Sequence, residues 1–128
     1  MAETLVFACT IENLTATPLK VKSVNLEWGK WEDRGNHKPV EIPAGKRLQA
    51  FRTSGRQSSS SGTEGTVVYQ FGDDSDATVE IYWDVPWAPG ANNTLKVNTS
   101  SKYIVVQTDG FVGSGSTETV TMNVGRIK

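Results

Sequence analysis

Hydrophobic and polar residues alternate along most of this chain. In the segment 3–12, ETLVFACTIE, the apolar residues Leu5, Phe7, Cys9 and Ile11 share one face. The same period recurs in the segments 48–51, 67–71, 77–83 and 120–124, whereas residues 102–107 are apolar on both faces. No long stretch carries the helical period of about 3.6 residues. The pattern therefore predicts β-strands and no helix.

The parity of the apolar residues changes within the segment 19–28, LKVKSVNLEW. A β-bulge near Lys22–Ser23 is predicted, because one extra residue restores a single apolar face. The residues that the bulge would bring together are Leu19, Val21, Val24, Leu26 and Trp28. In the segment 47–51, RLQAF, the pattern leaves open whether Ala50 or Phe51 joins Leu48 on the inward face.

Segments rich in Gly, Pro, Asn, Asp and Ser separate these runs. The expected loops are ENLTATP, GKWEDRGNHKP, IPAGK, SGRQSSSSGTEG, GDDSD, APGANN and TDGFVGSGS. Strands at intervals of about ten residues are typical of an all-β sandwich or barrel. The chain has 128 residues, with no internal repeat and no linker, so residues 1–128 are expected to form a single domain.

Charge and hydropathy exclude several classes of function. The 13 basic and 14 acidic side chains nearly cancel, which argues against nucleic-acid binding and against simple electrostatic adhesion to anionic lipid. The first residues, MAETLVFACT, lack the basic segment and long apolar run of a signal peptide, and no run is long enough to cross a membrane. We expect a soluble protein made in the cytoplasm.

The sequence carries little that points to catalysis, and neither a metal nor a cofactor is expected. Cys9 lies in an alternating apolar strand, so it is expected to be a buried core residue, and His37 lies in a loop. There is no nucleophile elbow, P-loop or zinc-ligand spacing. The acidic turn with Asp73, Asp74 and Asp76 is a candidate calcium site, but Asp and Gly at such a position ordinarily make the turn.

The four tryptophans fall in two short segments, EWGKWEDRG and YWDVPW. Parity places Trp28 and Trp83 on the inward faces of their strands and Tyr82 on the outward face. Trp31 and Trp87 follow the strand ends, where each could either cover the core or remain exposed. Pro86 is expected to end its strand, because proline cannot donate to a ladder.

An exposed aromatic cluster usually marks an interaction site. Tryptophan and tyrosine suit a membrane interface, and their ring faces attract the cation of a choline or ethanolamine headgroup. Sugar stacking is the competing use. Two or three such anchors supply about 4–8 kcal/mol, which corresponds to millimolar to micromolar binding. Firm attachment to a bilayer would need specific headgroup contacts, several copies or a partner.

The motifs EWGKW, SGR followed by GTEGT, and YWDVPW together resemble those of the aegerolysins. The chain is also similar to the small subunit of bacterial binary insecticidal toxins. The resemblance implies an antiparallel β-sandwich of the actinoporin-like type. It also implies binding to sphingolipid-containing membranes, with or without sterol, after release by a non-classical route. Many members act with a larger perforin-like protein that makes the pore.

The family's motif residues carry over onto this chain by position. They are Trp28 and Lys30 in WGK, Arg56 in SGR, and Tyr82, Trp83, Asp84, Pro86 and Trp87 in the hexapeptide. Val85 replaces the family's cysteine, and Ser61 stands where some members have an acidic residue that influences sterol dependence, with Glu64 following. An aromatic residue expected near NNTLKV is missing, so lipid preference does not transfer.

Our hypothesis from the sequence is a non-enzymatic lipid-binding component of a two-part cytolysin or insecticidal toxin. Its interfacial surface would contain Trp28, Trp31, Tyr82, Trp83, Asp84 and Trp87. Lys30 and Arg56 would contact the lipid phosphate, for which the arginine fork is well suited. A lectin that uses the same aromatics is the alternative. Either function requires the two tryptophan segments to lie side by side at one pole of the sandwich, with some indole uncovered.

Overall fold

The computed structural model describes residues 5–55, 62–87 and 90–127. Within these ranges the chain forms strands joined by turns and one short 3₁₀ turn, η1 (Asp33–Gly35). The strands are β1 (Val6–Asn13), β2 (Leu19–Trp28), β3 (Lys30–Trp31), β4 (Arg47–Ser54), β5 (Thr63–Phe71), β6 (Asp74–Val85), β7 (Thr94–Thr99), β8 (Ile104–Asp109) and β9 (Thr117–Arg126). No helix in the described ranges is long and apolar enough to cross a membrane.

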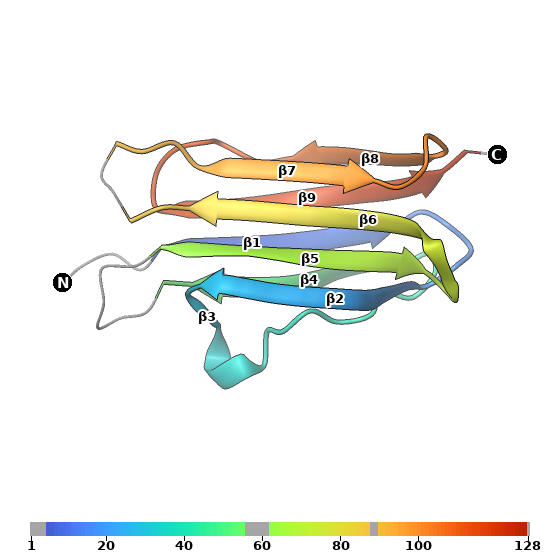
Figure 1. Cartoon of the computed structure of the whole chain (residues 1–128), viewed down its shortest axis with the longest axis horizontal. Helices are drawn as coiled ribbons and strands as arrows, with labels where there is room; N and C mark the ends of the chain where they lie inside the picture. Colours follow the sequence, from blue (N-terminus) through green and yellow to red (C-terminus); the bar gives the residue numbers. More distant parts are fainter. Residues whose placement is uncertain (1–4, 56–61, 88–89, 128) are drawn as a thin grey trace.

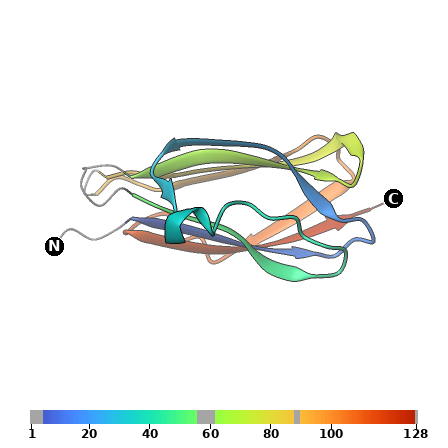
Figure 2. The same ribbon diagram turned by 90° about the horizontal axis from the view of Figure 1, so that it is seen from below.

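The strands form two sheets that lie face to face, which Figure 2 shows as separate layers. In the described residues one sheet has the order β3-β4-β1-β9-β8 and the other has the order β2-β5-β6-β7 (Figure 1). The predicted all-β sandwich is therefore confirmed. The pairing is antiparallel except between β1 and β9, which run parallel. These two strands lie at opposite ends of the sequence, so no short hairpin constrains them to be antiparallel.

A buried aromatic stack joins the two sheets. Trp83 is completely buried, and its ring lies parallel to that of Phe7, with the centroids 5.2 Å apart. The ring of Phe51 is 5.0 Å from Trp83. The indole nitrogen donates to Thr63 Oγ1 at 3.1 Å, so the polar atom is satisfied inside the core. Gly65, the cross-strand partner of Trp83, has no side chain to obstruct the indole.

Two register shifts determine which way β2 presents its side chains. The predicted bulge at Lys22 is present. A second shift, at Glu27, was not predicted, and it pairs Trp28 with the outward-facing Glu64. The prediction that Trp28 is a core residue is therefore wrong, and its side chain is 60% exposed. Val24 keeps the inward parity but is also exposed, because β2 is an edge strand.

The bulge in β4 resolves the ambiguity of the segment 47–51. Cys9 pairs with Phe51, whereas the next residue of β1 pairs with Gln49, so Ala50 is the extra residue. Ala50 and Phe51 are consequently both buried. Cys9 is buried as predicted, and burial raises the pKa of its thiol well above the ordinary value.

Two strands lie in segments that the sequence pattern assigned to loops or left unassigned. β3 lies within GKWEDRGNHKP and has only the two residues Lys30 and Trp31. β7 has the sequence TLKVNT, and its side chains are half-buried or exposed. β3 and β7 are both at the edge of a sheet. An edge strand buries little apolar surface, so its sequence lacks clear alternation.

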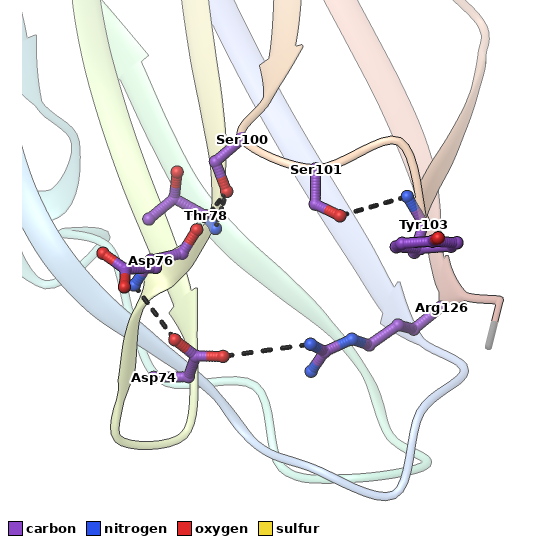
Figure 3. Close-up of polar contacts among 7 residues, drawn as sticks. All are labelled: Asp74, Asp76, Thr78, Ser100, Ser101, Tyr103 and Arg126. Atoms are coloured by element: carbon purple, nitrogen blue, oxygen red, sulfur yellow. Dashed lines mark hydrogen bonds and ion pairs between the residues drawn. The ribbon is translucent and has the colours of Figure 1, made fainter.

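The acidic turn lies at the pole opposite the end of β6, and its carboxylates form ion pairs. Asp74 lies 3.8 Å from the guanidinium of Arg126, and its other oxygen accepts from the backbone of Asp76 at 3.1 Å (Figure 3). Asp73 pairs with Lys20 at 3.0 Å. These contacts connect the turn to β2 and β9 and account for Asp73 and Asp74 as structural groups.

Side-chain hydroxyls link the adjacent loop between β7 and β8 to the same turn. Ser100 Oγ accepts from the backbone of Thr78 at 2.7 Å and donates to the carbonyl of Asp76 at 2.6 Å. Ser101 Oγ accepts from the backbone of Tyr103 at 3.1 Å (Figure 3). This pole is therefore held together by polar contacts.

The close contact between Gly65 and Trp83 predicts that a side chain at position 65 destabilises the protein. A Cβ at Gly65 would lie 2.7 Å from the indole and 2.8 Å from the carbonyl oxygen of Asn25. We expect Gly65→Ala to lower the free energy of unfolding by about 1–3 kcal/mol, the usual cost of overpacking. Urea denaturation followed by tryptophan fluorescence measures this change.

Gly125→Ala is the matched control, because Gly125 is also a strand glycine and the nearest atom to a new Cβ lies 4.0 Å away. It should leave the unfolding free energy almost unchanged. Equal stability of the two variants would contradict the role assigned to Gly65.

Candidate functional site

The two tryptophan segments meet at one end of the sandwich. We call this end the tryptophan pole; it contains Trp28 at the end of β2 and Trp87 just beyond β6. Their side chains are 60% and 40% exposed, respectively. Both line a cavity of about 320 Å³, whose other lining residues are Gly62, Thr63, Glu64, Asp84 and Pro86. The prediction that the segments lie side by side with some indole uncovered is confirmed.

Cross-strand pairing builds the floor of this cavity. Trp28 on β2 pairs with Glu64 on β5, which in turn pairs with Asp84 on β6. The three side chains form one row on the outer face of the sheet, because directly paired residues point to the same side. The neighbours of Glu64 in β5, Thr63 and Gly65, are buried and occupy inward-facing positions instead.

Glu64 is not among the site residues that the sequence pattern predicts. The signal that could have found it is the alternation in TEGTVVYQF, where Glu64 has the outward parity. Its partners became visible only with the register, because the pairing of β2 with β5 depends on the second bulge. The cavity is also lined by three residues of the predicted hexapeptide motif: Asp84, Pro86 and Trp87.

The cavity has a negative electrostatic character. Burial raises the pKa of Asp84, and the nearby charge of Glu64 raises it further. The described lining residues include two carboxylates and no basic side chain. A cation would relieve the repulsion between the two carboxylates, so the site favours a positively charged group between its indoles.

Tyr82 is hydrogen-bonded to Glu64, the middle residue of the row formed by Trp28, Glu64 and Asp84. As predicted, it has the outward parity, and its hydroxyl donates to Glu64 at 2.5 Å. This hydrogen bond is the main reason why the pKa of Tyr82 is raised, and burial adds to it. The ammonium of Lys96 lies 6.0 Å from the Tyr82 ring centroid. Tyr82 therefore positions the Glu64 carboxylate.

Two of the proposed aromatic contact residues belong to the core instead. Trp83 is completely buried, so its assignment to an interfacial surface is corrected, whereas the parity prediction for it is confirmed. Trp31 is half-buried and packs against the core. Its ring meets Phe51 edge-on at 6.1 Å and lies 6.3 Å from Trp83. Trp31 thus covers the side of the aromatic stack.

Gly29 separates the two neighbouring tryptophans. Its positive φ of 99° lets the chain pass from β2 in one sheet to β3 in the other. A Cβ there would lie 2.5 Å from the carbonyl oxygen of Ser54. Trp28 therefore remains on the outer face of the four-stranded sheet, whereas Trp31 turns to the core.

Of the two predicted phosphate contacts, only Lys30 lies within the described residues. Lys30 is exposed on β3, pairs with Ser54 in the other sheet and does not line the cavity. Arg56 lies outside the described residues. Contact of either residue with a lipid phosphate stays a prediction.

The family follows from comparison with known proteins. The aegerolysin family profile matches residues 6–127. The chain belongs to the aegerolysin family. A curated relative of this aegerolysin is Aegerolysin Aa-Pri1 from Cyclocybe aegerita, which is 28% identical over 125 residues, covering 91% of this chain and 86% of the relative.

Solved structures share the fold of this aegerolysin. RahU, crystallised with a Tris molecule, has a TM-score of 0.75 at 23% identity, covering 98% of this chain and 96% of RahU. The lipid-binding protein Nakanori has a TM-score of 0.76 at 15% identity, covering 98% and 73%. IP-1A from Alcaligenes faecalis has a TM-score of 0.68 at 23% identity, covering 97% and 92%.

The raised pKa of Asp84 predicts how its charge affects the free energy of unfolding at different pH values. Because the folded pKa exceeds the unfolded one, the charged carboxylate destabilises the native state at pH values above the folded pKa. Asp84→Asn should therefore raise the free energy of unfolding at pH 7, and the gain should disappear once acid protonates the wild-type carboxyl. Urea denaturation at neutral and acid pH measures both.

Asp109→Asn, at an exposed position on β8, controls for the change in net charge. A gain for Asp84→Asn that persists unchanged at acid pH would contradict a cost due to the half-buried charge.

Proposed function

We propose that this aegerolysin is a non-enzymatic membrane-lipid-binding protein that holds the cationic end of a lipid headgroup in the cavity at the tryptophan pole. One observation carries the proposal: the exposed indoles of Trp28 and Trp87 flank the adjacent carboxylates of Glu64 and Asp84. Choline and ethanolamine headgroups carry a cation that aromatic faces and carboxylates attract.

This arrangement changes the expected headgroup contacts. The sequence hypothesis placed basic residues around the phosphate, whereas the cavity offers negative groups to the ammonium. In a zwitterionic headgroup the two interactions are compatible, because the phosphate and the ammonium occupy different ends of the group. Lys30, exposed on β3 just beyond Trp28, remains a candidate for the phosphate.

The finer proposal is recognition of sphingolipid, with or without sterol, as the membrane-binding component of a two-part cytolysin or insecticidal toxin. Two exposed indoles and a headgroup contact supply only about 4–8 kcal/mol before ordering costs, so a single copy attaches loosely. Loose attachment suits a component that acts in several copies, or beside a larger perforin-like protein that makes the pore. Lipid binding by Nakanori, a neighbour in fold, supports the coarser part of this proposal.

Carbohydrate binding is the second candidate function. Tryptophan faces stack on sugar rings, and carboxylates accept hydrogen bonds from sugar hydroxyls, so the cavity has groups for both. The two proposals differ in whether a free saccharide is enough for binding. The adjacent carboxylates of Glu64 and Asp84 favour a cationic ligand over a neutral one, because a cation offsets the repulsion between them.

Vesicle composition provides the third prediction. We expect cosedimentation with vesicles that contain a choline-headgroup sphingolipid, weaker recovery with phosphatidylcholine, and least with phosphatidylglycerol, which has no ammonium. Each vesicle is prepared with and without sterol. Equal recovery from sphingolipid and phosphatidylcholine would remove the sphingolipid part of the proposal, and binding to a free saccharide without vesicle binding would favour the lectin.

Substitutions in the cavity provide the fourth prediction. Trp28→Ala and Trp87→Ala should each lower vesicle affinity about ten-fold, since each removes roughly 1.5 kcal/mol or more of apolar contact. Their thermal midpoints should barely change, because both side chains are exposed. Tyr103→Ala, an exposed aromatic near the opposite pole, should bind like the wild type. A similar loss in all three variants would exclude a specific role for the cavity.

A further inference from the structure

A second apolar feature lies at the tryptophan pole, outside the cavity. The loop 110–116 joins the end of β8 to the start of β9. Thr117, the first residue of β9, pairs with Val6 at the start of β1, and Val6 also pairs with Ser54 at the end of β4 (Figure 1). The loop carries Val112, whose side chain is 72% exposed, more than that of either tryptophan in the cavity.

A buried carboxylate holds this loop in place. Glu118 is completely buried and accepts hydrogen bonds from the backbone nitrogens of Val112 at 2.8 Å and Gly113 at 2.7 Å. It also accepts from the side-chain nitrogen of Asn93 at 2.8 Å. The backbone of Asn93 donates to the carbonyl of Gly113 at 2.8 Å. The loop is thereby joined to the segment that leads from Trp87 to β7.

The direction of Val112 follows from its neighbours. Phe111 is half-buried and packs against the core, whereas the next side chain is exposed. The backbone nitrogen of Val112 is fixed to Glu118, so the loop holds its apolar tip outward. The hydrogen bonds to the buried Glu118 carboxylate fix the loop conformation that exposes Val112, so this exposure is a built feature of the fold.

The loop that carries this tip has no charged side chain, and the nearest exposed charge along the sequence is Asp109, at the end of β8. The sequence has no charged residue from Val85 to Leu95 or from Gly110 to Thr117, and the carboxylate that follows, Glu118, is buried. The opposite pole differs, because Asp73, Asp74 and Arg126 form ion pairs there. An uncharged tip with internally hydrogen-bonded backbone costs little to transfer into a bilayer interface, whereas charged loops cost much more.

We propose that the loop 110–116 inserts Val112 into the apolar boundary of the same bilayer whose headgroup occupies the cavity. This inference rests on the proposed function. The protein then touches the membrane at two places on one pole: a polar headgroup contact at Trp28, Glu64 and Trp87, and an apolar contact at Val112. The occupant of the second surface is lipid hydrocarbon, because the exposed apolar tip lies at the same pole as the headgroup cavity and would face the same bilayer.

An environment-sensitive label tests the insertion directly. The only native cysteine, Cys9, is buried, so the single-cysteine substitution V112C can be labelled selectively with a nitrobenzoxadiazole fluorophore. We expect the emission to rise and shift to the blue on addition of sphingolipid vesicles. L14C is the matched control, because Leu14 is a 61% exposed apolar loop residue at the other end of β1. Water-like emission from labelled V112C on vesicles that bind it would overturn the inference.

A charge substitution tests the energetic contribution. V112D should lower the partition coefficient onto sphingolipid vesicles by about ten-fold or more, whereas L14D should bind like the wild type. Thermal midpoints report whether both variants are folded. If V112D does not fold, the fluorescence of labelled V112C on vesicles decides whether the loop inserts. Equal partitioning of V112D, L14D and wild type would overturn the insertion and leave the proposed function intact. Failure of the wild type to bind any vesicle would overturn both.

Discussion

The packing of Trp83 on Gly65 is the constraint on which the rest of the structure depends. The indole fits between the sheets only because its cross-strand partner has no side chain, and it then stacks on Phe7 and packs at a tilt against Phe51, both from the opposite sheet. This contact specifies the register of β5 against β6, since a shift by one residue would expose the indole and bury its charged neighbours. The hydrogen bond to Thr63 adds an orientation that apolar packing alone does not specify.

The outer face of the same strands follows from this register. With Trp83 inward, Tyr82 and Asp84 must point outward, and Glu64 beside Gly65 does the same. The carboxylates of Glu64 and Asp84 are then neighbours, although such a pair is unfavourable without a cation. A fold selected only for stability would avoid this repulsion. Its retention beside two exposed indoles is what makes the cavity a reasonable binding site.

The two poles of the sandwich differ in their chemistry. At one, ion pairs such as Asp74–Arg126 and hydroxyl contacts close the turns (Figure 3). At the other, two indoles and Val112 are exposed beside charged residues such as Lys30, and the charge that organises the loop, Glu118, is buried. This asymmetry gives the molecule one end suited to water and one suited to a lipid interface. The polar cavity and the apolar tip lie on the same end, so both can reach one bilayer.

The sequence by itself determined most of the long strands and the burial of Cys9 and Trp83, because side-chain alternation is a local property of an extended chain. It also placed the candidate site at the two tryptophan segments. Only the tertiary structure decided that Trp28 faces outward, that Glu64 belongs to the site and that β7 is a strand. Bulges, cross-strand neighbours and edge positions depend on the partner strand, and that partner is distant in sequence.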